Sequence, residues 1–158
     1  MSDYLKTKLN FLSIKRYLPK NKTLANYKPF IHTQNLIFLS GQLALTQSGI
    51  QNEGKIKKEY DLNLIKNSIE IATSNLLWNL NDCIEQINEN VNNVKCCNIK
   101  GYFNCENGFT DHPSLLNFAS NMIVNVLGNN GHHSRTAIGV SSLPLNSPVE
   151  IEGVFSIS

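Results

Sequence analysis

The sequence predicts an α+β domain in which a mixed β-sheet is covered on one face by two helices. Runs of β-forming residues lie near both ends of the chain and once more between them. Two long stretches carry apolar residues at helical spacing, the pattern of a helix that rests one face on a sheet. The order of elements, β-β-(β)-α-β-α-β-β, is that of a two-layer domain.

An N-terminal arm precedes the first of these runs. Over residues 1–25, apolar side chains such as Leu5 and Leu9 are mixed with lysine and asparagine, which predicts a short amphipathic helix that Pro19 ends. We expect this arm to pack on the domain or on a neighbouring subunit.

The first two strands are predicted to form a hairpin. Two β-forming runs, 30–33 and 36–40, surround the polar pair Gln34-Asn35. Gly41 is expected to close the second strand, at a point where the missing side chain lets another group approach the backbone.

The clearest helix begins at Asp61, after a polar stretch with Gly49 and Gly54 at turn positions. Asp61 is the expected N-cap, because its side chain can accept hydrogen bonds from the free amides of the first turn. The pattern breaks at residues 88–93. We interpret the helical stripe, with Trp78 at its margin, as core or interface. Its apolar residues recur at intervals of three, four or seven: Leu62, Ile65, Ile69, Ala72, Leu76, Leu80 and Ile87.

The second half of the chain repeats the change from strand to helix. Residues 94–103 form an expected strand, and the loop Asn104–Pro113 leads to a helix from about Ser114 to Gly128, where glycine provides the stop. Two final strands are expected at 133–140 and 149–154.

Composition excludes several classes of function. A formal net charge of +2 without a basic run makes a nucleic-acid partner unlikely. No apolar run approaches the length of a membrane span, and the N-terminus has no hydrophobic signal core. We therefore expect a cytoplasmic protein with no membrane partner. Reduced thiols are expected as well, since no C-x-x-C pair joins Cys83, Cys96, Cys97 and Cys105.

Each of the last two strands carries one charged residue that a core strand would avoid, Arg135 and Glu150. The arginine guanidinium matches a carboxylate with two parallel hydrogen bonds. A carboxylate can accept a proton or hold a water near the docked acid. The pair predicts a site for a small acid, although the residues alone also fit surface charges or an ion pair between neighbouring strands.

Motifs for metals and nucleotide cofactors are absent from the sequence. His132 and His133 are adjacent, so on an extended chain they point to opposite faces, and no carboxylate or cysteine stands at a zinc-like spacing. There is no P-loop and no G-x-G-x-x-G. We expect no metal and no cofactor.

Six blocks occur in order along the chain: Leu39-Ser40-Gly41-Gln42, Gly101-Tyr102-Phe103-Asn104, Gly108-Phe109-Thr110-Asp111, His133 to Val140, Leu143-Pro144, and Val149-Glu150-Ile151-Glu152. Together they resemble the YjgF/RidA family, in particular its longer subgroup of about this length. The similarity runs from about Asn26 to the C-terminus, so we expect residues 26–158 to form a single domain of this family. The resemblance implies a chorismate-mutase-like fold and a homotrimer closed around a central barrel.

The resemblance also implies an activity, the hydrolytic deamination of reactive 2-enamine and 2-imino acids to 2-oxo acids and ammonia. Such an imine deaminase is a hydrolase acting on a C=N bond, and its ligand is a small imine or keto acid. By position, Arg135 matches the arginine that grips the carboxylate, and Glu150 matches the residue that orients water. Tyr27, Gly41 and His133 match residues that line the cleft, which lies between subunits in the family.

Two positions depart from the catalytic relatives. Ala137 stands where many of them have cysteine, and Gly139 where they often have a larger polar residue. Two other functions therefore stay open. One is a non-catalytic trimer that binds or senses a small acid through Arg135, and the other is a ribonuclease, an activity described for family members.

Overall fold

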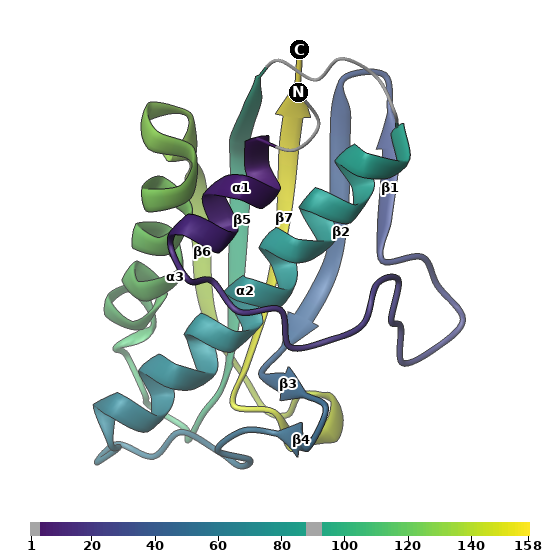
Figure 1. The fold of residues 1–158 in the computed structure, drawn as a ribbon. Coiled ribbons are helices and arrows are strands. Elements are labelled where there is room, and N and C mark those ends of the chain that lie inside the picture. Colours follow the sequence, from purple (N-terminus) through teal and green to yellow (C-terminus); the bar gives the residue numbers. More distant parts are fainter. Residues whose placement is uncertain (1–3, 88–92) are drawn as a thin grey trace.

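The computed structural model describes residues 4–87 and 93–158, and a five-stranded mixed sheet forms its centre (Figure 1). The strands are β1 (Phe30–Thr33), β2 (Leu36–Leu43), β5 (Val94–Asn104), β6 (Ser134–Val140) and β7 (Val149–Ile157). Their order across the sheet is β1-β2-β7-β5-β6, which puts β7 in the middle and β6 at one edge. β5 and β6 run parallel, and the other pairs are antiparallel.

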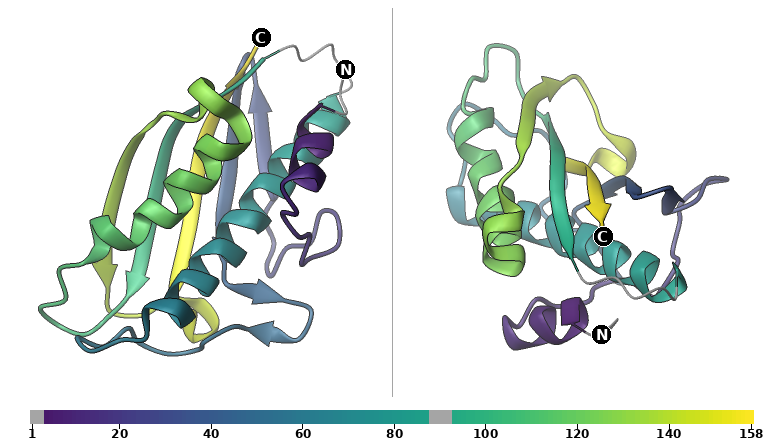
Figure 2. Two further views of the ribbon diagram at one scale, coloured as in Figure 1. Left: turned by 60° about the vertical axis from the view of Figure 1, so that its left-hand side comes forward. Right: turned by 90° about the horizontal axis from the view of Figure 1, so that it is seen from above.

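Two helices, α2 (Leu62–Ile87) and α3 (His112–Leu127), cover one face of this sheet. The short helix α1 (Tyr4–Phe11) packs on both of them, on the side away from the sheet (Figure 2). Fully buried side chains of the sheet, such as Ile37, Ile99 and Phe155, meet the helices in the core. The predicted α+β architecture with a mixed sheet under two helices is confirmed. The opposite face, here called the open face, carries no helix among the described residues.

The ends of the two long helices follow from their local sequence. Asp61 caps α2 as predicted: its Oδ1 accepts hydrogen bonds from the amides of Asn63 at 2.9 Å and Leu64 at 3.3 Å. α3 begins two residues before the predicted Ser114, because the first turn of a helix accepts Pro113. It ends at Gly128, which takes a φ of 61°. The break expected at residues 88–93 lies, except for Asn93, outside the described residues.

The predicted hairpin of β1 and β2 is present, but β2 does not end at Gly41. It continues to Leu43, with an irregular register between Leu39 and Gln42 where it pairs with β7. The polar stretch that follows forms a small hairpin of its own. The two strands of this hairpin are β3 (Leu45–Thr46) and β4 (Gly49–Ile50). Two short 3-10 helices lie later in the chain, η1 (Gly128–Gly131) and η2 (Pro144–Asn146).

The N-terminal segment, residues 4–29, packs on α2 and is hydrogen-bonded to it. α1 ends at Phe11 rather than at Pro19, since the backbone turns at Ser13 with a φ of 56°. Beyond it, Arg16 forms a two-bonded ion pair with the carboxylate of Asp82 on α2. The same guanidinium lies 5.0 Å from the centre of the Trp78 ring. No described helix is long and apolar enough to cross a membrane.

Replacing Arg16 with methionine should lower the free energy of unfolding by about 3 kcal/mol, because Asp82 would remain buried without a partner. Lys20→Met is the matched control, since Lys20 pairs with Glu85 at the surface and its loss should change stability by less than about 1 kcal/mol. Urea denaturation measures both. Equal losses in the two variants would contradict the structural role given to Arg16.

Candidate functional site

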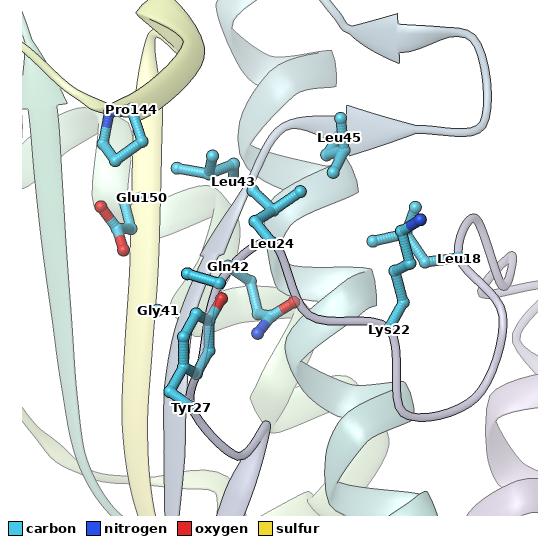
Figure 3. Close-up of a pocket in the computed structure, with 11 residues that line it drawn as sticks. Leu18, Lys22, Leu24, Tyr27, Gly41, Gln42, Leu43, Leu45, Pro144 and Glu150 are labelled. Carbon is cyan, nitrogen blue, oxygen red and sulfur yellow. The ribbon is translucent and has the colours of Figure 1, made fainter.

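A pocket of about 280 Å³ lies where β2 and β7 meet the N-terminal segment (Figure 3). Tyr27, Gly41 and Glu150 lie together at one side of it. Lys22 and Leu18 stand on the other side, and the walls between are largely apolar. The remaining lining residues are Leu24, Ala25, Gln42, Leu43, Leu45 and Pro144.

Glu150 supplies the carboxylate of this pocket. On β7, Val149 and Ile151 are fully buried under the helices, so the intervening Glu150 points to the open face. Its carboxylate accepts no side-chain hydrogen bond from another described residue. Burial, and secondarily the negative charge of Glu152, raises the pKa of Glu150 above its ordinary value. The group is therefore a better proton acceptor than an exposed glutamate.

Gly41 makes room for this carboxylate. A Cβ atom added at residue 41 would overlap Oε1 of Glu150, far inside van der Waals contact. The backbone of β2 can approach Glu150 this closely only because residue 41 has no side chain. The glycine thus leaves the space in which the Glu150 carboxylate lies.

Arg135 lies on the other face of the sheet. It is in register with Ile99 of β5, which is fully buried beneath the helices, so both side chains point toward the helical layer. Its guanidinium is exposed at the edge of the sheet and contacts α3. Nη1 donates to Oγ of Ser120 at 3.1 Å, and Nη2 donates to the carbonyl of Pro113 at 3.2 Å. His133 contacts the same serine, with 3.0 Å between Nε2 and Oγ.

One protomer therefore does not bring Arg135 and Glu150 together. β5 separates their strands, and their side chains occupy opposite faces. The interpretation as an ion pair between neighbouring strands is wrong. The structure instead forms two groups, one with Tyr27, Gly41 and Glu150 in the pocket, and one with Arg135 and His133 beside α3.

The two positions that depart from the relatives lie near the second group. Ala137 is partly buried and packs against the core. At Gly139, an added Cβ would lie 2.6 Å from Nε2 of His112 and 2.7 Å from Sγ of Cys105, which are themselves 3.5 Å apart. The space that a larger residue 139 would need is occupied by this thiol and imidazole.

Three of the four cysteines, Cys83, Cys96 and Cys105, are buried and poorly suited to act as nucleophiles. All four are free thiols, and burial raises the pKa of Cys83 and Cys96 to about 12. Burial also raises the pKa of Cys105. Among the described residues, no three His, Cys, Asp or Glu side chains are grouped so that they could hold a metal ion.

The sequence did not reveal all the residues that build these groups. Lys22 and Leu24 come from an irregular segment with no periodicity, so no pattern marked them as pocket residues. Ser120 is one of two serines on an otherwise ordinary amphipathic helix. Only its contacts with two residues of the β6 region distinguish it.

If the pocket binds a small acid, Gly41→Ala should weaken that binding, because the added methyl group would push the Glu150 carboxylate out of the space that it occupies. Calorimetric titration with 2-oxobutanoate measures the binding, and circular dichroism checks the fold. Gly49→Ala is a control on backbone strain, since its Cβ would meet open space although its φ is 112°. Wild-type affinity in Gly41→Ala would show that Glu150 is not held where the structure has it.

Solved structures with the same fold are known. The protein Atu1372 from Agrobacterium tumefaciens, whose function is unknown, is 29% identical and has a TM-score of 0.81, with 99% of this chain and 96% of that chain covered. A protein of Shewanella oneidensis described as a putative endoribonuclease is 20% identical, with a TM-score of 0.79 and coverage of 98% and 99%. TdcF from E. coli, solved with bound serine, is 13% identical, with a TM-score of 0.60 and coverage of 91% and 98%.

A curated relative, Protein TCP17 from Trypanosoma cruzi, is 33% identical over 58 residues. The match spans 36% of this chain and 36%, about a third, of the length of that protein. The family described as "YjgF/chorismate mutase-like, putative endoribonuclease" matches residues 13–155, nearly the whole chain. The chain therefore belongs to the YjgF/chorismate-mutase-like family.

Proposed function

We propose that this protein hydrolyses reactive 2-enamine and 2-imino acids to 2-oxo acids and ammonia, at a site shared by neighbouring subunits of a homotrimer. The observation that carries the proposal is the half-buried carboxylate of Glu150, which lies in a small, mostly apolar pocket beside Tyr27. A carboxylate with a raised pKa in such a place suits an exchange of protons with water.

The reaction needs little more from the protein than this carboxylate in its pocket. An enamine first becomes the imine by moving one proton from nitrogen to carbon. The oxygen of water then bonds to the imine carbon, and the proton that it loses passes to Glu150. Glu150 returns that proton to the nitrogen, which gives an amino alcohol. The hydroxyl proton of this intermediate then passes through Glu150 to the nitrogen, the C–N bond breaks, and the carbon is left as a carbonyl while ammonia departs. The protonated imine is already electrophilic, so orientation of the water is the main contribution of the protein.

Arg135 is proposed to hold the substrate carboxylate for the pocket of a neighbouring subunit. Its guanidinium is exposed at the edge strand β6, whereas Glu150 of the same chain lies on the opposite face. A site that uses both groups therefore needs two chains. An arginine fork would fix the acid in one orientation, with its reactive carbon toward the water.

The open face supports the homotrimer. Ile31, Phe38 and Ile138 have exposed fractions of 48%, 45% and 43%, and register places Ile31 beside Phe38 and Ile138 beside Tyr102 on this face. Exposed apolar side chains on one sheet face are typical of a surface that another chain covers. Three such sheets around a common axis would bury them.

A second candidate function is the binding of a small acid or amino acid without turnover. It is favoured by Ala137, which stands where many catalytic relatives have cysteine, and by the serine bound to TdcF. Ribonuclease activity, named in the family description, is a third. The formal net charge of +2 gives little attraction for an RNA backbone.

The first test is the release of ammonia and 2-oxobutanoate from 2-iminobutanoate generated in situ by a dehydratase. The wild type should accelerate the release, and Arg135→Ala should lose roughly a hundredfold in kcat/KM, about 3 kcal/mol for a charge-assisted contact. Arg135→Lys should recover only part, since an ammonium cannot form the fork. Lys66→Ala, at an exposed site on α2, is the control.

Each alternative function predicts a different outcome, measured with the same set of variants. Binding of 2-oxobutanoate without any acceleration, in a confirmed trimer, would favour the binding protein. Salt-dependent cleavage of RNA that survives Arg135→Ala would favour the ribonuclease. Unchanged imine hydrolysis by Arg135→Ala would remove Arg135 from the site.

The activity should rise with pH as Glu150 ionises, because only the carboxylate form can accept the proton of water. Burial and Glu152 hold the pKa of Glu150 above its usual value, so the rise should be centred above pH 4.5. Glu152→Gln removes the neighbouring negative charge, lowers the pKa of Glu150 and should move the rise to lower pH. The pH profile of kcat/KM measures this shift, with Glu70→Gln on α2 as the control. A shift to higher pH would contradict the role given to Glu150.

A further inference from the structure

We propose that Ser120 and His133 are positioning residues, which hold the guanidinium of Arg135 in the orientation that receives a substrate carboxylate. The inference rests on the proposed function, since it assigns Arg135 to the substrate. The hydroxyl of Ser120 lies at the centre of this arrangement. It is 3.1 Å from Nη1 of Arg135 and 3.0 Å from Nε2 of His133.

The direction of each hydrogen bond follows from its partners. Nδ1 of His133 lies 2.5 Å from the carbonyl oxygen of Gly131, and a carbonyl can only accept, so Nδ1 carries the proton. In the neutral imidazole, Nε2 is then an acceptor, and the Ser120 hydroxyl donates to it. The oxygen of that hydroxyl keeps its lone pairs for the N–H of Arg135. The chain of hydrogen bonds therefore runs in one direction, from Arg135 through Ser120 and His133 to Gly131.

Both ends of this chain are attached to α3. A Cβ atom at Gly131 would lie 2.6 Å from Cα of Val124, so the buried Gly131 packs directly on the backbone of that helix. Ser120 belongs to α3 itself, and so does Pro113, whose carbonyl accepts the second N–H of Arg135 at 3.2 Å. One rigid helix thus sets the positions of the imidazole, the hydroxyl and the guanidinium.

The guanidinium keeps enough donors for a ligand. Arginine has five N–H groups, and Ser120 and Pro113 use two of them, which leaves 5 − 2 = 3. Two are sufficient for a bidentate carboxylate. The contacts with α3 therefore orient the fork without saturating it.

A positioning role explains why an exposed side chain is fixed in this way. Arg135 lies on an edge strand, where a long side chain would otherwise sample many rotamers. Ordering such a side chain when the ligand binds would reduce affinity. If α3 orders it beforehand, the loss of Ser120 should weaken binding while the stability of the domain changes little.

The test is a double-mutant cycle read by calorimetric binding of 2-oxobutanoate to the assembled protein. Ser120→Ala should weaken binding about five- to thirtyfold, the size of one charge-assisted hydrogen bond, and Ser120→Thr, which keeps the hydroxyl, should restore most of it. His133→Phe should weaken binding in the same direction. Ser114→Ala, in the first turn of the same helix, is the matched control and should bind as the wild type does.

The cycle separates this inference from the proposed function. In the Arg135→Ala background, Ser120→Ala should have no further effect, because the group that it positions is gone. If Arg135→Ala loses binding while Ser120→Ala binds like the wild type, or if the two losses simply multiply, Ser120 does not position Arg135. If Arg135→Ala itself binds normally, the proposed site has failed and not the positioning alone.

Discussion

The alternation of side chains along a β-strand decides on which face of the sheet each candidate site residue lies. β5 lies between β6 and β7, and the register with β5 puts Arg135 on the helix-covered face while Glu150 points to the open face. Each charged group therefore contacts different neighbouring elements. Gly41 and the N-terminal segment enclose Glu150, and α3 holds Arg135. The strand β5 and the two opposite faces of the sheet thus separate two groups of candidate site residues, which a second chain is proposed to bring together.

Much of the fold could be predicted, because its main elements have local causes. The stripe of α2, its cap at Asp61 and the stop of α3 at Gly128 all depend on neighbours in the sequence. The order of the strands does not. Nothing in the alternating runs of β6 and β7 indicates that β5 lies between them, since that order results from packing across the whole sheet. The end of α1 was missed for a related reason: tertiary contacts of Arg16 and its neighbours with α2 hold the extended segment that follows.

The residues of the candidate site could be predicted, but their arrangement in space could not. The resemblance selected Tyr27, Gly41 and Glu150, which the structure brings into one pocket, and it selected Arg135 and His133, which lie together elsewhere. Their division into two groups depends on strand order and was therefore hidden. The wall formed by the N-terminal segment was hidden as well, because an irregular chain leaves no periodic signal. Its course depends on contacts with α2, including the buried ion pair of Asp82.

The central position of β7 also bears on how the chain folds during synthesis. β7 follows every other described strand in the sequence, yet it joins β2 on one side to β5 on the other. Before β7 has paired, no strand connects the hairpin of β1 and β2 to the unit formed by β5, α3 and β6. Each of these parts exposes a strand edge in that interval, a state in which unfinished chains aggregate. Of the described strands, the one that joins the two parts of the sheet is thus the last in chain order, and both parts expose an unpaired strand edge until it has paired.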